Sequence, residues 1–249
     1  MINTAHHRYL SVVIPTFNES GRILPTLESV VSYLRLQSYS WEIVVVDDGS
    51  FDRTPSIVLN WVKDNIEESE SCRVISVGHE GKGSAVKTGM LAAKGTYRLM
   101  CDADDAVSAE QIGKFIGVIE SGNYDIVIGS RQIEGAERIH ETRLRYSMGR
   151  LFNWFVRVAA VSGIQDTQCG YKCFKEAVAL DLFQSQKIMG WGFDVEILFL
   201  ASRKNMNILE MPVSWINVEK SKVQIHRASL EMVRDILLLR LRYLFGRYK

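Results

Sequence analysis

Short apolar runs alternate with stretches of helical spacing over the first half of the chain. The apolar runs lie at residues 9–15, 41–46, 73–77, 97–101 and 124–130. Their length and their β-branched residues predict buried strands. Apolar residues recur at helical spacing over residues 20–36 and 84–94, in a segment that starts at Thr54, and between the last two runs. Strands that alternate with helices predict an α/β fold with a mostly parallel, doubly wound sheet.

The pattern changes after residue 131. Residues 143–159 predict an amphipathic helix, and the polar loop "GIQDTQCGYK" follows at residues 163–172. Residues 230–249 predict another long helix. Because no proline-rich linker, low-complexity stretch or internal repeat interrupts the chain, we expect one α/β domain over residues 1–229, with residues 230–249 as its C-terminal helical extension.

Composition narrows the class of protein. The 249 residues carry a net charge of +1 and are 47% hydrophobic, which is enough for an ordinary core and gives no indication of a nucleic-acid partner. The four cysteines lack the spacing of a disulfide framework or a zinc ribbon, and the N-terminus lacks the apolar core of a secretory leader. No stretch approaches the ~20 apolar residues of a membrane span. We therefore expect a reduced, cytosolic protein.

Carboxylates follow at least three of the predicted strands. The first strand ends in "PTFNES", the second ends on Asp47 and Asp48 in "VVVDDGS", and the fourth ends on Asp102 and Asp104 in "CDADD". The carboxyl ends of parallel strands meet at one sheet edge, where α/β proteins bind ligands. Each acid alone is also explained by a solvated turn, since Asp-Gly forms turns readily. Together, unneutralised acids would repel each other, and a divalent cation or bound donor groups would relieve that repulsion.

The Asp102-Ala103-Asp104 segment is the sharpest of these features. In an extended segment, residues two apart point to the same side, so both carboxylates can address one hard cation. Mg²⁺ typically takes one or two carboxylates together with substrate phosphates. No G-x-G-x-x-G follows the first strand, and "GHEGKGS" lacks the spacing of a P-loop. Lys82 in that segment still suits an anion near a helix start, with an exposed turn lysine as the plain alternative.

Seven motifs of this chain occur in an order that resembles a known family. They are "VVIPTFNE", "VVVDDGS", "HEGKGSAVKTGM", "CDADD", "IGSR", "DTQCGYK" and "WGFDVE". In this order they resemble the inverting glycosyltransferases of family 2, which have the GT-A fold. The resemblance extends from residue 10 to about residue 245. The loop "DTQCGYK" and the tail "RDILLLR" are most similar to the polyprenyl-phosphate sugar transferases, first the dolichyl-phosphate β-glucosyltransferases and then the mannosyltransferases.

This resemblance implies a nucleotide-sugar donor. Asp47 or Asp48 would reach the uracil or the ribose, and Lys82 would lie near the base or the diphosphate. Asp102 and Asp104 would hold the ribose and the Mg²⁺ or Mn²⁺ ion that bridges the diphosphate. The other wall of the base pocket would comprise Pro15, Thr16, Phe17 and Glu19.

The resemblance also implies a polyprenyl-phosphate acceptor, which attacks the anomeric carbon with inversion. A phosphate monoester is already anionic at neutral pH, because its second pKa is about 6, so a strong general base is unnecessary. Arg131 and Lys172 are the expected cationic guides for this phosphate. Asp166 and Asp194 are the candidates for orientation or weak base catalysis. The structural alternative for Asp194 and Glu196 is favourable charge at a helix N-terminus.

A polyprenyl acceptor requires contact with a membrane. From Lys220 to the C-terminus, eight lysines and arginines accompany two acids, and leucines recur between them. A basic amphipathic helix of this kind can lie in the interface of an anionic bilayer. The alternative is that its apolar stripe packs on the domain or on another subunit. Since no transmembrane segment is apparent, we expect peripheral attachment at the cytoplasmic face.

Three functions stay open from the sequence. The first is metal-dependent transfer of a hexose to a polyprenyl phosphate, with UDP-glucose favoured as the donor and GDP-mannose as the nearest variant. The second is transfer to a non-lipid glycan, which would make a base such as Asp166 or Asp194 mandatory. The third is a non-catalytic nucleotide-sugar-binding subunit, against which the intact Asp102 and Asp104 argue. Neither the sugar nor the oligomeric state follows from these motifs.

Overall fold

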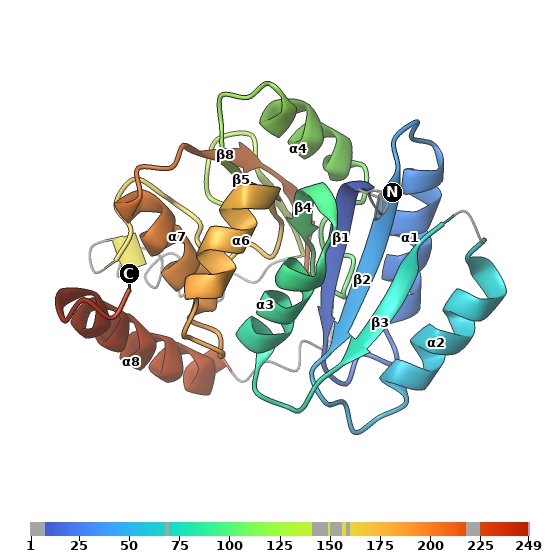
Figure 1. Cartoon of the computed structure of the whole chain (residues 1–249), viewed down its shortest axis with the longest axis horizontal. Helices are drawn as coiled ribbons and strands as arrows, with labels where there is room; N and C mark the ends of the chain where they lie inside the picture. The colour runs from blue at the N-terminus through green and yellow to red at the C-terminus, as the bar shows by residue number, and fades with distance from the viewer. Residues whose placement is uncertain are drawn as a thin grey trace, which may run out of the picture.

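A computed structural model describes residues 8–67, 70–140, 149, 156–157, 160–217 and 225–248. Its centre is a seven-stranded sheet in the order β3-β2-β1-β4-β7-β5-β8, with helices against both faces (Figure 1). The first five strands are β1 (Arg8–Thr16), β2 (Trp41–Asp47), β3 (Cys72–Ser76), β4 (Gly95–Met100) and β5 (Ile126–Ser130). The helices among them are α1 (Ile23–Arg35), α2 (Thr54–Asn65), α3 (Lys82–Ala92) and α4 (Gln111–Glu120).

The second half of the chain completes the sheet and adds a small second one. Its elements are β6 (Glu137–Ile139), β7 (Lys172–Lys175), α6 (Glu176–Ser185), α7 (Phe193–Arg203), β8 (Ile208–Pro212), β9 (Ser214–Ile216) and α8 (Ile225–Leu244). Strand β7 pairs antiparallel with both β4 and β5, whereas the other pairs of the large sheet are parallel. Strands β6 and β9 form the second, two-stranded sheet.

The predicted α/β class and the mostly parallel sheet are confirmed, and all five predicted strands are present. Residues 163–172 are predicted as a loop, but the last of them, Lys172, begins strand β7, which the sequence pattern does not predict. The predicted helix over residues 143–159 falls almost entirely outside the described residues. The C-terminal helix begins at Ile225, five residues before its predicted start. The division into a domain and an extension stays a prediction.

Two apolar clusters, one on each face of the sheet, hold the fold together. One cluster joins the sheet to α3, α6, α7 and α8, and the other joins it to α1, α2 and α4. Strand β2 is buried along its whole length, as its run of valines predicts. All four cysteines are free thiols, which agrees with the expectation of no disulfide framework.

Helix α3 packs so closely on β1 that position 89 tolerates no side chain. A Cβ on Gly89 would lie 2.3 Å from Cγ1 of Val13. We expect Gly89→Ala to lower the free energy of unfolding by about 1–3 kcal/mol, because the added methyl overpacks a close-packed interior. Gly117 in α4 is the matched control, since a Cβ there meets nothing within 4 Å. Gly117→Ala should be neutral or stabilising by up to about 1 kcal/mol. Urea unfolding of both variants checks this, and equal stabilities would contradict it.

Candidate active site

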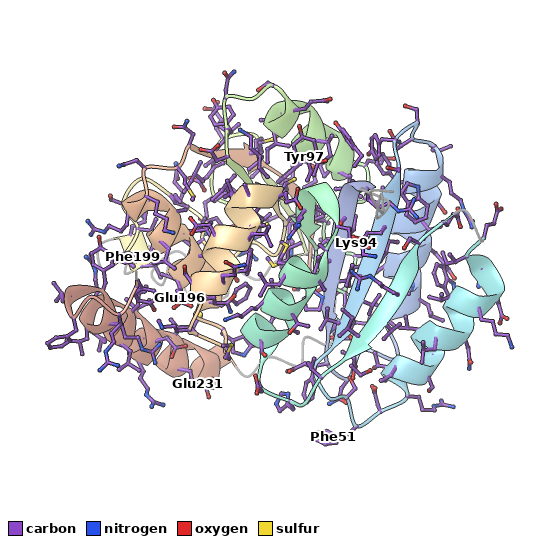
Figure 2. All side chains as sticks on the ribbon, viewed as in Figure 1. Phe51, Lys94, Tyr97, Glu196, Phe199 and Glu231 are labelled. Carbon is purple, nitrogen blue, oxygen red and sulfur yellow. The ribbon has the colours of Figure 1, made fainter. Side chains whose placement is uncertain are left out.

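The carboxyl ends of β1, β2 and β4 converge, as predicted, at one edge of the sheet. The last residues of β1 and β2 are paired, with Thr16 opposite Asp47. Phe51, in the loop after β2, lies at this edge and points away from the domain (Figure 2). Its ring packs edge-on against that of Phe17, with 6.0 Å between the ring centroids. The predicted base-pocket residues therefore come together at the same edge as the acids.

Both acids of "DDGS" are buried and occupied by internal hydrogen bonds. Asp47 is 2% exposed and accepts hydrogen bonds from the amide (3.0 Å) and the hydroxyl (2.5 Å) of Ser50. Asp48, also 2% exposed, accepts hydrogen bonds from the amides of Glu80 and Gly81, both at 3.0 Å. Asp47 thus closes a turn, as the alternative to a ligand site predicts, although this turn is buried and not solvated. Asp48 fixes residues 79–81 over the sheet edge.

The other predicted base-pocket residues have distinct surroundings. Pro15 lies within β1, opposite Val46, and Thr16 directs its hydroxyl towards Asp47 at 3.4 Å. The Phe17 ring stacks on the imidazole of His79. Glu19 forms an ion pair with Arg22 at 2.6 Å, at the entrance to α1. The sequence analysis missed Arg22 and the ring contact of His79, which lie outside any spacing motif.

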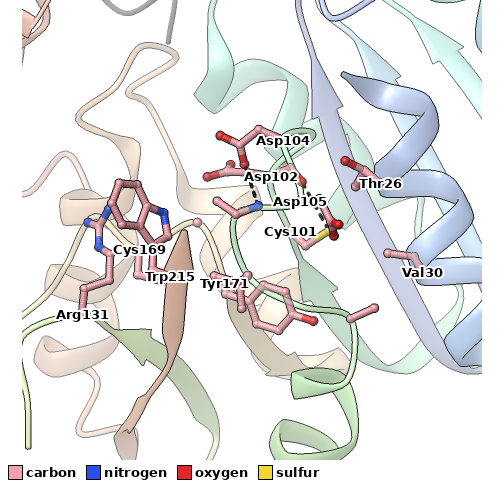
Figure 3. A pocket seen from close by; sticks show the side chains of 14 residues that line it. Thr26, Val30, Cys101, Asp102, Asp104, Asp105, Arg131, Cys169, Tyr171 and Trp215 are labelled. Atoms are coloured by element: carbon pink, nitrogen blue, oxygen red, sulfur yellow. Dashed lines mark hydrogen bonds between the residues drawn. The ribbon is translucent and has the colours of Figure 1, made fainter. Parts of the chain in front are cut away.

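The D-x-D segment turns instead of running extended, yet its carboxylates still influence each other (Figure 3). Asp102 pairs with Nζ of Lys82 at 2.6 Å, and Nη1 of Arg22 lies 4.0 Å from Asp104. Burial raises the pKa of Asp104, and the nearby charge of Asp102 raises that pKa further. Burial acts on the pKa of Asp102 in the same direction, but Lys82 holds that pKa below its ordinary value. The Asp102 and Asp104 side chains are 35% and 30% exposed.

A pocket opens beside this segment (Figure 3). Its lining includes Asp102, Asp104, Arg131, Gly170 and Trp215. A Cβ on residue 170 would lie 1.9 Å from Oδ2 of Asp102. Only a glycine at this position therefore lets the loop before β7 approach the acidic turn.

Arg131, at the end of β5, is held by a fully buried acid. Its Nε and Nη2 contact the two carboxylate oxygens of Asp166 at 2.8 and 3.0 Å, and its backbone amide adds a third bond at 3.0 Å. Its guanidinium carbon lies 5.5 Å from the ring centre of Trp215. Burial raises the pKa of Asp166, but the pair with Arg131 outweighs burial and lowers that pKa to about 2. Asp166 is therefore ionised and serves to orient Arg131.

Lys172 and Asp194 form a second buried pair. Nζ of Lys172 lies 2.6 Å from Oδ1 of Asp194 and 2.5 Å from the carbonyl of Cys169. The two side chains are 2% and 5% exposed. Burial raises the pKa of Asp194, although Lys172 opposes that shift. Asp194 and Glu196 both lie in the first turn of α7, as the structural alternative proposed.

These pairs bear on two sequence-based expectations. The acids that follow the predicted strands were expected to be unneutralised, but Asp102 pairs with Lys82 and Glu19 pairs with Arg22. Both cations come from the chain itself, which corrects that expectation for these two acids. Lys172 is expected to guide a phosphate, and this role stays a prediction; its ammonium group is buried against Asp194 and donates to the carbonyl of Cys169.

Comparison with known proteins places these residues in a family. The family model described as "Glycosyl transferase family 2" matches residues 11–175. The chain belongs to glycosyltransferase family 2. It is 38% identical to "Dolichyl-phosphate beta-glucosyltransferase" of Saccharomyces cerevisiae, over 97% of this chain and 77% of that protein. The proteins of the same name from Dictyostelium discoideum and Homo sapiens are 35% and 34% identical, over 99% and 97% of this chain and 78% of each relative.

Solved structures of other glycosyltransferases share the fold. Glucosyl-3-phosphoglycerate synthase from Mycobacterium tuberculosis, in complex with Mn²⁺, UDP and glucosyl-3-phosphoglycerate, aligns with a TM-score of 0.70. The alignment covers 93% of this chain and 80% of that one, at 17% identity. A complex of the same enzyme with Mg²⁺ and UDP aligns with a TM-score of 0.69. These matches agree with the predicted GT-A fold.

The acidic turn of this family 2 glycosyltransferase fits a metal that the substrate helps to hold. Among the described residues, no group of three or more acids, histidines and cysteines is arranged as a protein-only metal site. Two partly exposed carboxylates are nevertheless what Mg²⁺ or Mn²⁺ needs when phosphates complete its coordination. Burial raises the pKa of Asp104, and the nearby charge of Asp102 adds to that rise although Lys82 opposes it. Asp102 and Asp104 therefore stay the candidate ligands.

Asp166 generates a stability prediction with a defined pH window. Because its folded-state pKa is depressed to about 2, its ionisation stabilises the fold above about pH 4, and this contribution is lost as the pH falls from about 4 to 2. We expect Asp166→Asn to lower the free energy of unfolding at pH 7 by roughly 2–4 kcal/mol, since it also leaves Arg131 without its partner. The difference from wild type should shrink at pH 3. Urea unfolding at both values measures this.

Asp181→Asn is the control for that experiment. It removes an ion pair with Lys204 whose side chains are 34% and 44% exposed. Such a surface pair contributes about 0–1 kcal/mol. A loss for Asp166→Asn no larger than this, or one that is equal at pH 7 and pH 3, would contradict the buried-pair assignment.

Proposed function

We propose that this family 2 glycosyltransferase transfers a hexose from a nucleotide sugar to a dolichyl or polyprenyl phosphate with inversion at the anomeric carbon. UDP-glucose is the favoured donor. The observation that carries the proposal is the name of its relatives, since proteins called dolichyl-phosphate beta-glucosyltransferase match it at 34–38% identity over nearly the whole chain. The charges and burial of the site support the same reaction.

The donor would lie along the carboxyl edge of β1, β2 and β4. In this proposal the base approaches Phe17 and Asp48, and the diphosphate approaches Lys82 and the acidic turn. Lys82 begins α3, where the backbone amides of a helix start also favour an anion. Its charge is retained on burial, because Asp102 and Asp194 raise its pKa against the opposing effect of desolvation.

A divalent cation at Asp102 and Asp104 would supply Lewis-acid stabilisation of the departing nucleoside diphosphate. The chain's own residues orient the reactants around it. Arg22, shared between Glu19 and Asp104, fixes the acidic turn against α1. The absence of a side chain at Gly170 leaves room for the Asp102 carboxylate beside the loop before β7.

The arrangement of the candidate bases favours an acceptor that is already anionic. Asp166 is fully buried, with its pKa lowered to about 2, so it is a poor proton acceptor at neutral pH. Asp194 is 4% exposed and bound to Lys172. A glycan hydroxyl would need a base, whereas a lipid phosphate would not. Arg131 lines the pocket, and among the described residues its pair with Asp166 uses Nε and Nη2, so Nη1 would be the atom offered to the acceptor phosphate.

The surface of the C-terminal helix supports peripheral contact of the protein with the cytoplasmic face of a membrane. In the part of the chain that the structure describes, no helix has both the length and the apolar character needed to cross a bilayer. Helix α8 buries Met232, Ile236 and Leu239 in the protein. It also exposes an apolar stripe, comprising Leu237, Leu241, Leu244 and Phe245, whose members are 49–78% exposed. One face of α8 therefore packs on the domain, and the other face carries apolar side chains that a membrane could cover.

A transfer assay tests the function. Purified protein is incubated with Mg²⁺ or Mn²⁺, a short-chain polyprenyl phosphate and a panel of radiolabelled UDP- and GDP-sugars. We expect label from UDP-glucose to pass into the organic phase. We expect Asp104→Asn to lower this transfer at least ~100-fold, about 2.7 kcal/mol of transition-state stabilisation, without loss of fold. Asp64→Asn, on exposed α2, is the control. Label transferred from GDP-mannose alone would assign GDP-mannose as the donor in place of UDP-glucose. Label found only in a water-soluble product would contradict the lipid acceptor.

A flotation assay tests the membrane face. We expect the double variant Leu241→Ser, Leu244→Ser to bind vesicles of anionic and neutral lipid at least ~10-fold more weakly than wild type, because it removes two exposed apolar side chains from the interface. Leu36→Ser is the control, since Leu36 is 82% exposed at the end of α1. Unchanged binding of the double variant would assign the stripe to a protein contact instead.

A further inference from the structure

The imidazole of His79 makes two specific contacts at the edge where the donor base is proposed to bind. Its ring stacks on that of Phe17, with 4.1 Å between centroids and 13° between planes. Its Nδ1 lies 2.7 Å from Oδ2 of Asp48 and 3.1 Å from the backbone oxygen of the same residue. The His79 side chain is nevertheless 49% exposed, whereas that of Asp48 is 3% exposed. His79 thus covers both an aromatic face and a buried carboxylate from the solvent side.

The same two contacts are those that a pyrimidine base would seek. A nucleobase offers a flat π face, which stacks favourably on an aromatic side chain. Uracil also presents a ring N–H at N3, which a carboxylate oxygen can accept. A single-ring base matches an imidazole in size more closely than a purine does. The His79 ring therefore has the shape, the stacking and the hydrogen bond of a bound pyrimidine.

We propose that His79 occupies the base subsite when no donor is bound, and that the base of a nucleoside diphosphate replaces its imidazole on Phe17 and Asp48. This inference rests on the proposed function, because it concerns the base of the same donor. It makes His79 an internal competitor of the donor, placed between the protein and the solvent.

The local structure allows the side chain to leave while its backbone stays. A Cβ on Gly49 would lie 2.8 Å from the amide nitrogen of His79, so the backbone at residue 79 is packed tightly against the turn after β2. The next two amides, of Glu80 and Gly81, are bonded to Asp48. Rotation of the exposed imidazole about its own side-chain bonds therefore uncovers Phe17 and Oδ2 of Asp48 without opening the loop.

Competition by His79 predicts that removal of its side chain strengthens donor binding, which a supporting role would not predict. Apparent affinity falls by the fraction of molecules in which the subsite is open, so removal of the competitor tightens binding. We expect His79→Ala to bind UDP about 3- to 10-fold more tightly than wild type, the range that one stacked aromatic pair typically represents. A residue that merely supports the pocket would give weaker binding on removal.

The experiment is isothermal titration calorimetry of the full chain with UDP and, separately, with ribose 5-diphosphate, which lacks the base. His79→Asn is a second variant, which retains an N–H donor for Asp48 but loses the ring. His140→Asn is the matched control, because His140 is an exposed histidine whose backbone is left-handed, a conformation that asparagine tolerates. We expect UDP binding to tighten for both His79 variants and ribose 5-diphosphate binding to stay within 2-fold of wild type.

A nuclear magnetic resonance titration reports on the ring itself. The imidazole resonances of His79 should carry the ring-current shift of Phe17 without ligand and lose it on addition of UDP. Weaker UDP binding by His79→Ala, an equal gain for ribose 5-diphosphate, or His79 resonances that keep their shift at saturating UDP would each overturn the proposal. If wild type binds neither UDP nor GDP, the proposed function fails instead, which keeps the two conclusions separate.

Discussion

The buried ion pair between Lys172 and Asp194 is the interaction on which the site depends. The two charged groups lie 2.6 Å apart and are buried. Removal of one partner leaves the other charge buried and unpaired, which typically lowers the free energy of unfolding by about 3–5 kcal/mol. Lys172 opens β7, in the middle of the sheet, and Asp194 lies in the first turn of α7, so the pair ties that helix to the sheet. Nζ of Lys172 also donates to the carbonyl of Cys169, which holds the preceding loop in place. Gly170 reaches Asp102 as a consequence.

Alternating charges extend from this pair across the sheet edge. Asp166 pairs with Arg131, and Asp102 pairs with Lys82. Arg22 contacts both Glu19 and Asp104, so this cluster retains one uncompensated carboxylate charge. That excess lies at the acidic turn, whose side chains are about one-third exposed, and not at the buried pairs. The proposed divalent cation would lie at this acidic turn, where it would offset the excess charge, whereas the buried acids have partners of their own.

The sequence predicted the elements that local patterns determine. The run of valines before Asp47 predicts a buried strand whichever strands lie beside it. The acids that follow this strand must then lie at the edge of the sheet. Strand β7 was missed because "KCFK" is short and bears lysine at both ends, and only its place between β4 and β5 makes it a strand. The ion pairs were missed because they too depend on which segments the fold brings together. Arg131 and Asp166 are 35 residues apart, and no spacing rule joins them.

The C-terminal helix and the region around Lys82 both contact the segment 187–192. The hydroxyl of Tyr248 donates to Glu196, whose carboxylate also accepts hydrogen bonds from the amides of Lys187 and Ile188. Asp235 in α8 lies against Gly192, where a Cβ would come within 2.7 Å of it. The ring of Trp191, between these contacts, lies 5.5 Å from Nζ of Lys82. One face of α8 therefore sets the position of the segment beside Lys82, while its other face presents leucines to the surroundings. A surface bound by those leucines would therefore lie at a fixed distance from Lys82.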